Sequence, residues 1–183
     1  CVHLAFPDWT AELLPAFLVN RAYRAVADAE AAPAECRIRA LRLLGELGGD
    51  LAAGQEADLA LARKKASETE LLACYARKSG ALFAAALAGG ALLCGADDAA
   101  AFALRAAGMR LGQAYQLFDD VADGPEEDGA DRESGRFTAY SLWGPARAVR
   151  RAEELLAEAA RALDRFGPAA AGLRGLLEQM RGR

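Results

Sequence analysis

The sequence contains few of the residues that build β-sheets or zinc sites. Aromatic residues make up only 7% of its 183 positions, and β-branched residues are scarce, whereas alanine and leucine dominate. This balance favours helices over sheets. His3 is the only histidine, and the four cysteines lie far apart without a CxxC pair, which argues against a Cys/His zinc site.

The sequence also lacks a basic patch and a signal peptide. Its 22 basic and 26 acidic residues are mixed along the chain, so no basic arm points to nucleic acid. No charged segment leads into an apolar one at the start, as a signal peptide requires. We interpret the cysteines as small buried apolar residues of a reduced, cytoplasmic protein. The start at Cys1 rather than methionine indicates a processed or truncated N-terminus.

One stretch, from Ser79 to Ala96, contains no charged residue. Its length reaches the lower limit for a membrane span, which is roughly 17 residues. The stretch is rich in alanine and glycine and is weakly hydrophobic for its length. We therefore predict a buried helix of a bundle and no transmembrane segment.

Helical signals follow one another along the chain with short breaks. Ser67 and Glu70 have the spacing of a capping box, which predicts a helix start that continues through the uncharged stretch. Residues 124–135 combine Gly, Pro and acidic residues, so we expect a loop there, either a mobile flap over a ligand or a solvated connector. The other expected helices cover residues 9–29, 34–62, 98–123, 145–163 and a short tail. The pattern predicts an all-α bundle in a single domain.

Three carboxylates, Asp119, Asp120 and Asp123, follow an apolar run with no basic residue among them. On a helix, positions three and four residues apart share a face, so all three can project from one surface. Such crowded negative charge needs a cation, and Mg²⁺ takes hard oxygen ligands and bridges carboxylates to phosphate oxygens. The cluster predicts a place where a metal-bound phosphate docks.

Two other polar pairs are spaced three residues apart. Gln55 and Asp58 can bind a metal–water shell or a polar substrate, but the exposed face of any helix has the same pattern. Tyr75 and Lys78 can grip a phosphate oxygen together, whereas a lysine beside an apolar helix often only extends to solvent. Arg136 follows Gly135 and could approach a phosphate closely, although a surface arginine is the simpler reading.

The order of these elements resembles the trans-isoprenyl diphosphate synthases, the polyprenyl synthetase family. The matching segments are Gly-Gln-x-x-Asp-Leu, Lys-Ser-Gly-Ala-Leu-Phe, Gly-x-x-Leu-Gly-x-Ala-Tyr-Gln-Leu-Phe-Asp-Asp-x-x-Asp and Gly-Arg-x-Thr, and they span essentially the whole chain. The resemblance implies an all-α bundle of the isoprenoid synthase type around a central apolar cavity.

The resemblance also implies roles for individual residues. Asp119, Asp120 and Asp123 would bind Mg²⁺ and the diphosphate of a substrate, and Lys78, Asp119 and Asp120 would serve in catalysis. The expected substrate-binding residues are Gln55, Asp58, Lys78, Ser79, Gln116 and Arg136. Arg136 stands where the family has lysine, which keeps the positive charge but replaces a compact ammonium with a planar group.

The sequence departs from the family pattern near its start. The family has a first aspartate-rich motif and paired arginines upstream of a His-x-x-Phe segment, which His3-Leu4-Ala5-Phe6 resembles. The family's later Gly-Asp is missing, with Pro15-Ala16 near its place. We therefore expect residues 1–183 to be the C-terminal portion of one polyprenyl synthetase domain, without its N-terminal helices.

The function implied by the resemblance is condensation of isopentenyl diphosphate with an allylic prenyl diphosphate to a longer trans-prenyl diphosphate. Magnesium and cationic side chains would stabilise the departing diphosphate. A homodimer is implied, with a heteromer as the alternative. The competing interpretation is a non-catalytic regulatory subunit or a truncated inactive relative of the same family. Product length and the allylic primer stay open.

Overall fold

The computed structural model describes residues 2–61, 66–134 and 138–181, and the side chains of these ranges except residues 2–3 and 125–134. Every regular element within these ranges is helical, which confirms the all-α prediction. The elements are α1 (Val2–Ala5), α2 (Asp8–Ala27), α3 (Ala34–Leu61), α4 (Glu68–Tyr75), η1 (Ala76–Gly80), α5 (Ala81–Leu93), α6 (Asp98–Ser134), α7 (Ala139–Trp143), α8 (Pro145–Ala162), η2 (Asp164–Ala170) and α9 (Ala171–Arg181).

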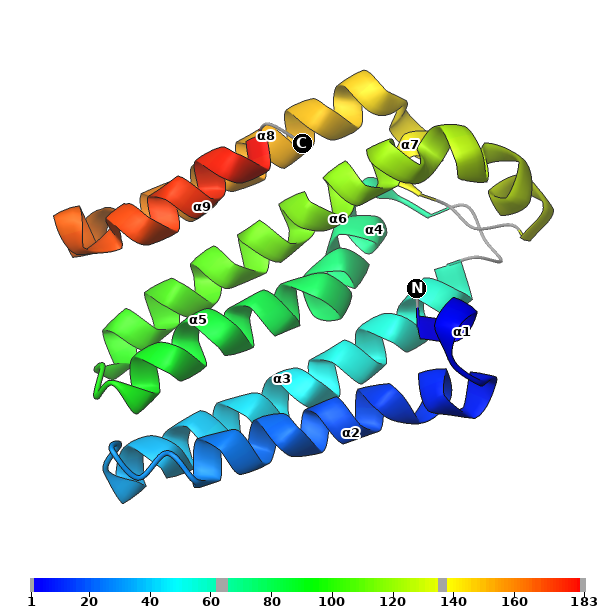
Figure 1. The fold of residues 1–183 in the computed structure, drawn as a ribbon. Helices are drawn as coiled ribbons and strands as arrows, with labels where there is room; N and C mark the ends of the chain where they lie inside the picture. The colour runs from blue at the N-terminus through cyan, green and yellow to red at the C-terminus, as the bar shows by residue number, and fades with distance from the viewer. Residues whose placement is uncertain (1, 62–65, 135–137, 182–183) are drawn as a thin grey trace.

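The helices stack as antiparallel pairs in three layers (Figure 1). The α2–α3 pair forms one outer layer, α8 and α9 form the other, and α4, η1, α5 and α6 lie between them. Contacts of α5 with α3 and of α6 with α8 join the layers. The middle layer therefore positions residues on both of its faces.

The two outer layers differ in how much apolar surface they bury. Helix α8 buries a stripe at helical spacing, Ala148, Ala152, Leu155, Leu156 and Ala159, against the middle layer. Helix α2 has no fully buried residue, and most of its large apolar side chains are exposed. The core of the bundle thus lies between α4–α6 and α8 rather than under α2.

The uncharged stretch lies within the middle layer. By length and composition, Glu68–Leu93 is the one described helical segment able to cross a membrane. It contacts α3 on one side and α6 on the other, and Ala81, Ala84 and Ala88 are buried there. These contacts agree with the predicted core helix.

An apolar cavity of about 200 Å³ lies between α2, α3 and α5. Its walls include Leu18, Val19, Leu47, Leu51, Ala81 and Ala85. Small side chains on α5 leave this space open, since each alanine fills less volume than a leucine would. The resemblance predicted a central apolar cavity, whereas this one lies between an outer helix pair and the middle layer.

Local signals locate most helix starts correctly. Ser67 forms the predicted capping box, with the Glu70 N–H donating to Ser67 Oγ at 3.2 Å and the Ser67 N–H to Glu70 Oε2 at 2.9 Å. The predicted loop at residues 124–135 is wrong, because α6 continues to Ser134. Three glutamates, an alanine and an arginine there favour a helix, and adding a residue to an existing helix costs less than starting one.

The cysteine prediction holds in part. Cys74 is buried, Cys36 is half-buried and Cys94 is exposed, and all three are free thiols. Cys94 follows the last residue of α5 at a helix end, where packing does not cover it. Its exposure corrects the expectation that the cysteines are buried.

Candidate functional site

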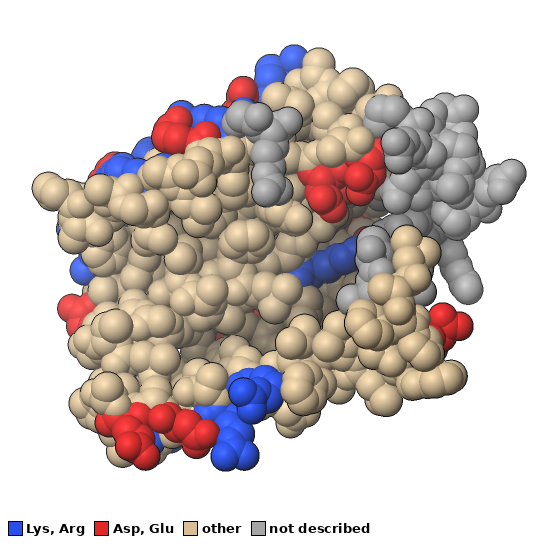
Figure 2. Space-filling view, in the orientation of Figure 1, with Lys and Arg blue, Asp and Glu red and all other residues tan. Residues whose placement is uncertain are grey.

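The predicted site residues meet where the C-terminal half of α3, the η1 turn and the C-terminal half of α6 come together. Figure 2 shows this face, with acidic side chains gathered near the C-terminal half of α6 and basic atoms in the hollow below them. The η1 turn makes polar contacts with both of the other segments, through Lys78 to α3 and through Ser79 to α6.

Helix α3 approaches η1 closely at Gly54. A Cβ atom at this position would lie 2.4 Å from the backbone nitrogen of Lys78, so only glycine allows the contact. One turn later, Asp58 Oδ2 accepts from Lys78 Nζ at 2.6 Å, and the two side chains are only 15% and 20% exposed. Gln55, the other member of the predicted pair, is exposed. The structure therefore brings Asp58 and Lys78 together and leaves Gln55 at the rim.

Lys78 and Ser79 lie in η1, a single π-helical turn. Such turns interrupt α-helices rarely and occur often at functional sites. Ser79 Oγ donates to Gln116 Oε1 on α6 at 2.8 Å, while Lys78 faces Asp58 on α3. Adjacent residues of the turn thus reach two different helices.

The side chain of Asp120 turns into the protein rather than toward its neighbouring aspartates. Its Oδ2 accepts from the Tyr75 hydroxyl and, at 2.8 Å, from the Ala139 N–H, and its Oδ1 accepts from Gln116 Nε2 at 3.1 Å. Burial raises the pKa of the Asp120 carboxyl, which these three hydrogen bonds oppose and the charge of Asp119 reinforces.

The aspartate cluster is therefore divided. Asp119 is half-buried and Asp123 is exposed, one helical turn apart on α6, while Asp120 is buried. Within the described ranges, no three His, Cys, Asp or Glu residues are arranged to hold a metal ion. Two carboxylates on one helix face still suit Mg²⁺, which keeps several waters and takes further oxygens from phosphates.

The sequence analysis did not predict the contacts of two buried residues at the site, Tyr75 and Cys74. The Tyr75 hydroxyl was expected beside Lys78 as a phosphate contact, but it bonds to Asp120, and burial together with that carboxylate raises the pKa of Tyr75. Cys74 Sγ donates to the Gly54 carbonyl at 3.4 Å, and burial, reinforced by Asp58, raises its pKa to about 11. The sequence offered one signal for these roles. Tyr75 and Ser79 are four residues apart, as are Gln116 and Asp120, so each pair shares one face of its helix and the two faces can meet.

The start of α7 closes this side of the site. Thr138 caps the helix by accepting the Ser141 N–H on Oγ1 at 3.2 Å. The next residue, Ala139, donates its N–H to Asp120. Arg136, the predicted phosphate contact, lies outside the described residues.

The sequence is similar to a known protein family and to several of its members. The sequence model of the Polyprenyl synthetase family matches residues 1–133. A geranylgeranyl diphosphate synthase of Pantoea ananas is 30% identical over 79% of this chain and 49% of its own length. A probable farnesyl diphosphate synthase of Sinorhizobium fredii is 31% identical over 97% of this chain and 57% of its own. The chain thus spans about half the length of the curated relatives it matches.

Solved structures resemble the whole described fold. An apo FPP/GFPP synthase from Zymomonas mobilis aligns with a TM-score of 0.81 at 26% identity, over 98% of this chain and 63% of its own. A geranyltransferase from Helicobacter pylori, complexed with magnesium and isoprenyl diphosphate, aligns with a TM-score of 0.78 at 23% identity, over 98% and 61%. At this identity, the similarity to the Helicobacter pylori structure shows a shared fold.

Proposed function

The chain belongs to the polyprenyl synthetase family, and on that premise we propose that the protein is a magnesium-dependent trans-prenyltransferase. The proposed reaction joins isopentenyl diphosphate to an allylic prenyl diphosphate and releases diphosphate. One observation carries the proposal: adjacent residues of η1, Lys78 paired with Asp58 and Ser79 bonded to Gln116, lie beside the helix that carries Asp119 and Asp123.

Asp119 and Asp123 are the proposed magnesium ligands. They lie on one helix face, Asp119 half-buried and Asp123 exposed, which leaves room for a hydrated ion and phosphate oxygens. Asp120 was predicted as a third ligand, but its two oxygens already accept three hydrogen bonds inside the protein. When bound, magnesium would act as a Lewis acid that neutralises charge on the departing diphosphate.

Lys78 is the proposed cationic contact to diphosphate. Its ammonium has three donors, and Asp58 occupies one of them in the structure. Asp58 therefore holds the ammonium in place and leaves two donors for phosphate oxygens. Ser79 and Gln116 orient each other beside it, at 2.8 Å. Gln55 and Arg136 remain proposed substrate contacts on the strength of the resemblance.

The apolar cavity between α2, α3 and α5 is the proposed space for the growing prenyl chain. Its lining carries no charge, which suits a hydrocarbon and keeps water from an allylic cation. The small residues Ala81 and Ala85 leave it open on the α5 side. Larger side chains at these positions should shorten the product.

A cytoplasmic homodimer is the proposed state of the protein. The apolar side chains Trp9, Leu13 and Phe17 on α2 are 60–67% exposed, and exposed patches of this kind mark interaction surfaces. The free thiols of Cys36, Cys74 and Cys94 suit a reducing compartment. Sedimentation of the full-length protein at twice the monomer mass would support the dimer, and monomer mass would oppose it.

The function is tested on the full-length protein with isopentenyl diphosphate and a labelled allylic diphosphate, with magnesium or with EDTA. We expect longer prenyl diphosphates only with magnesium. Lys78→Met should lower turnover about 100-fold, the usual effect of removing one group that stabilises developing charge. Arg77→Met, the exposed neighbouring cation, is the matched control and should stay within twofold. No magnesium-dependent product, alone or with a partner, would favour the non-catalytic interpretation.

A further inference from the structure

Tyr75 lies at the junction of α4 and the π-helical turn, 3% exposed, and contacts Asp120 in the aspartate cluster. We propose that Tyr75 is a positioning residue that acts through Asp120 to fix the aspartate turn of α6 and the first turn of α7 against η1. The inference rests on the proposed function, because it assigns Tyr75 a role in that same site.

A single carboxylate oxygen joins three segments of the chain. Asp120 Oδ2 on α6 accepts both the Tyr75 hydroxyl, which precedes η1, and the N–H of Ala139, the first residue of α7. The two donors are fixed in space, one by a buried ring and one by a helix backbone. Asp120 therefore cannot turn outward without breaking both hydrogen bonds.

A second set of contacts, one helical turn away, holds η1 and α6 in the same relative position. Ser79 donates to Gln116, and Gln116 donates in turn to the other oxygen of Asp120. Tyr75 and Ser79 thus face Asp120 and Gln116 across two antiparallel helices. We call these four residues the polar seam. The seam determines how α6 is rotated about its axis, and that rotation decides where Asp119 and Asp123 point.

Close backbone packing continues the polar seam. A Cβ at Gly112 would lie 2.5 Å from the Cα of Gly80, so η1 and α6 touch without intervening side chains. Such a tight contact gives the helices little freedom to adjust when a polar atom of the seam is lost. Removing the Tyr75 hydroxyl leaves a buried carboxylate short of one donor, which is costly for a charged group.

The test compares Tyr75→Phe with Tyr140→Phe in the full-length protein. Tyr140 lies on α7 with its ring against Gly124, and its hydroxyl has no hydrogen bond within the described residues. Tyr75→Phe should lower kcat at least tenfold with less than a threefold change in KM for either substrate, because every substrate-binding side chain is kept while the orientation of Asp119 and Asp123 is altered. Tyr140→Phe should stay within twofold in both.

Two further readouts separate positioning from a general structural role. Hydrogen exchange of residues 139–143 in metal-free protein should accelerate at least tenfold in Tyr75→Phe and stay unchanged in Tyr140→Phe. In combination with Asp120→Asn, the Tyr75→Phe loss should largely disappear, because both changes break one contact. The inference would be overturned if the kcat losses of Tyr75→Phe and Asp120→Asn multiplied in the double variant. It would also be overturned if Tyr75→Phe stayed within twofold of wild type in both kcat and hydrogen exchange.

A second variant covers the case in which Tyr75→Phe does not fold. Ala139→Pro removes the other donor to Asp120 at the first position of a helix, where proline is best tolerated. Its preceding residue, Thr138, already has extended angles of φ −102° and ψ 164°. The same loss of kcat is expected, and unchanged kcat would overturn the inference. If wild type forms no product, the proposed function fails, while the exchange comparison still decides the role of Tyr75.

Discussion

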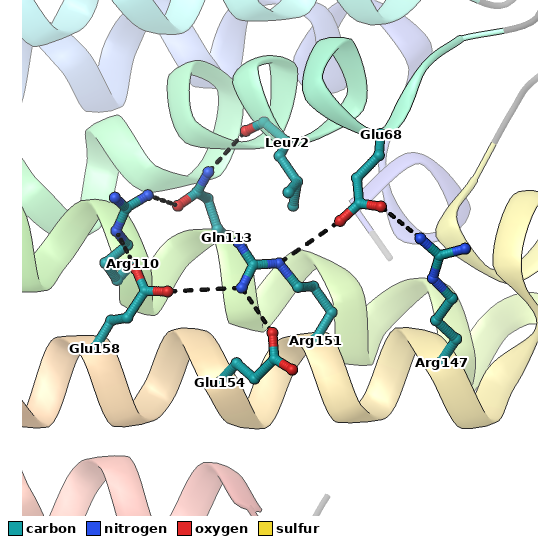
Figure 3. Close-up of polar contacts among 8 residues, drawn as sticks. All are labelled: Glu68, Leu72, Arg110, Gln113, Arg147, Arg151, Glu154 and Glu158. Atoms are coloured by element: carbon teal, nitrogen blue, oxygen red, sulfur yellow. Dashed lines mark hydrogen bonds and ion pairs between the residues drawn. The ribbon is translucent and has the colours of Figure 1, made fainter.

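Two polar networks of the bundle differ in burial and in charge. The polar seam lies within the middle layer and contains one buried carboxylate. The ion-pair network in Figure 3 joins α4, α6 and α8 through long charged side chains. It comprises Glu68, Arg110, Gln113, Arg147, Arg151, Glu154 and Glu158, with Gln113 bonded to the Leu72 carbonyl.

The ion-pair network offers alternative partners for Arg151, Glu68 and Glu158. Arg151 lies among Glu68, Glu154 and Glu158, and Arg147 pairs with Glu68 at 2.6 Å. Exposed pairs of this kind contribute about 0–1 kcal/mol each, whereas a hydrogen bond to a buried charge contributes about 1.5–3 kcal/mol. The polar seam therefore depends on single hydrogen bonds, and the ion-pair network does not.

The largest effect is expected where the polar seam meets the backbone contact. Gly112→Ala places a methyl group 2.5 Å from the Cα of Gly80 and should lower the free energy of unfolding by about 3 kcal/mol. Gly90→Ala, a helical glycine with open space around it, is the control and should raise it by about 0.5 kcal/mol. Urea unfolding measures both, and equal effects would contradict the close packing.

Next in size is the loss of the buried carboxylate. Asp120→Ala leaves the Tyr75 hydroxyl and the Ala139 N–H without their acceptor and should cost about 2–3 kcal/mol of unfolding free energy. Glu154→Ala, from the ion-pair network, should cost under about 1 kcal/mol, because its side chain is 63% exposed. Similar losses in the two variants would remove the distinction between the networks.

A smaller difference between the two networks is expected in how salt changes the stability that a substitution costs. Glu68→Gln should cost about 0.5 kcal/mol at low ionic strength and almost nothing in 1 M NaCl, where the Debye length falls to roughly 3 Å. The Tyr75→Phe cost should not change with salt, because the contact is buried. Thermal unfolding at both salt concentrations tests this, and a salt-independent Glu68→Gln effect would be evidence against it.

The smallest effect concerns Cys74. Burial and the charge of Asp58 hold its pKa near 11, above the 9.0 of an exposed thiol. The folded state therefore keeps this proton while the unfolded state loses it, so stability should fall as pH rises between these values. At pH 8, iodoacetamide should modify exposed Cys94 and leave Cys74 unmodified until the protein unfolds. Mass spectrometry that found equal labelling would contradict the burial.

Sequence patterns predicted whatever depends on local spacing. The Ser67 capping box and the shared helix face of Asp119 and Asp123 follow from three- and four-residue spacing. The family resemblance assigned Lys78 and Asp58 to one site, and the structure adds the ion pair between them.

Features that depend on how helices pack were not predictable in the same way. The inward turn of Asp120 requires Tyr75 and Ala139, which are 45 and 19 residues away, and a π-helical turn has no local sequence signal. The continuation of α6 to Ser134 was missed because Gly and Pro outweighed the surrounding helix formers. In each case tertiary contacts or helix propagation decided the outcome.

Asp119 and Asp123 are proposed to bind magnesium together with a diphosphate. Calorimetry of inorganic pyrophosphate binding to the full-length protein, with and without magnesium, tests this most directly. Binding should require magnesium and weaken at least tenfold in Asp119→Asn and in Asp123→Asn, but not in Asp164→Asn, an exposed aspartate of η2. Binding that is independent of magnesium, or equal in all three variants, would contradict the account.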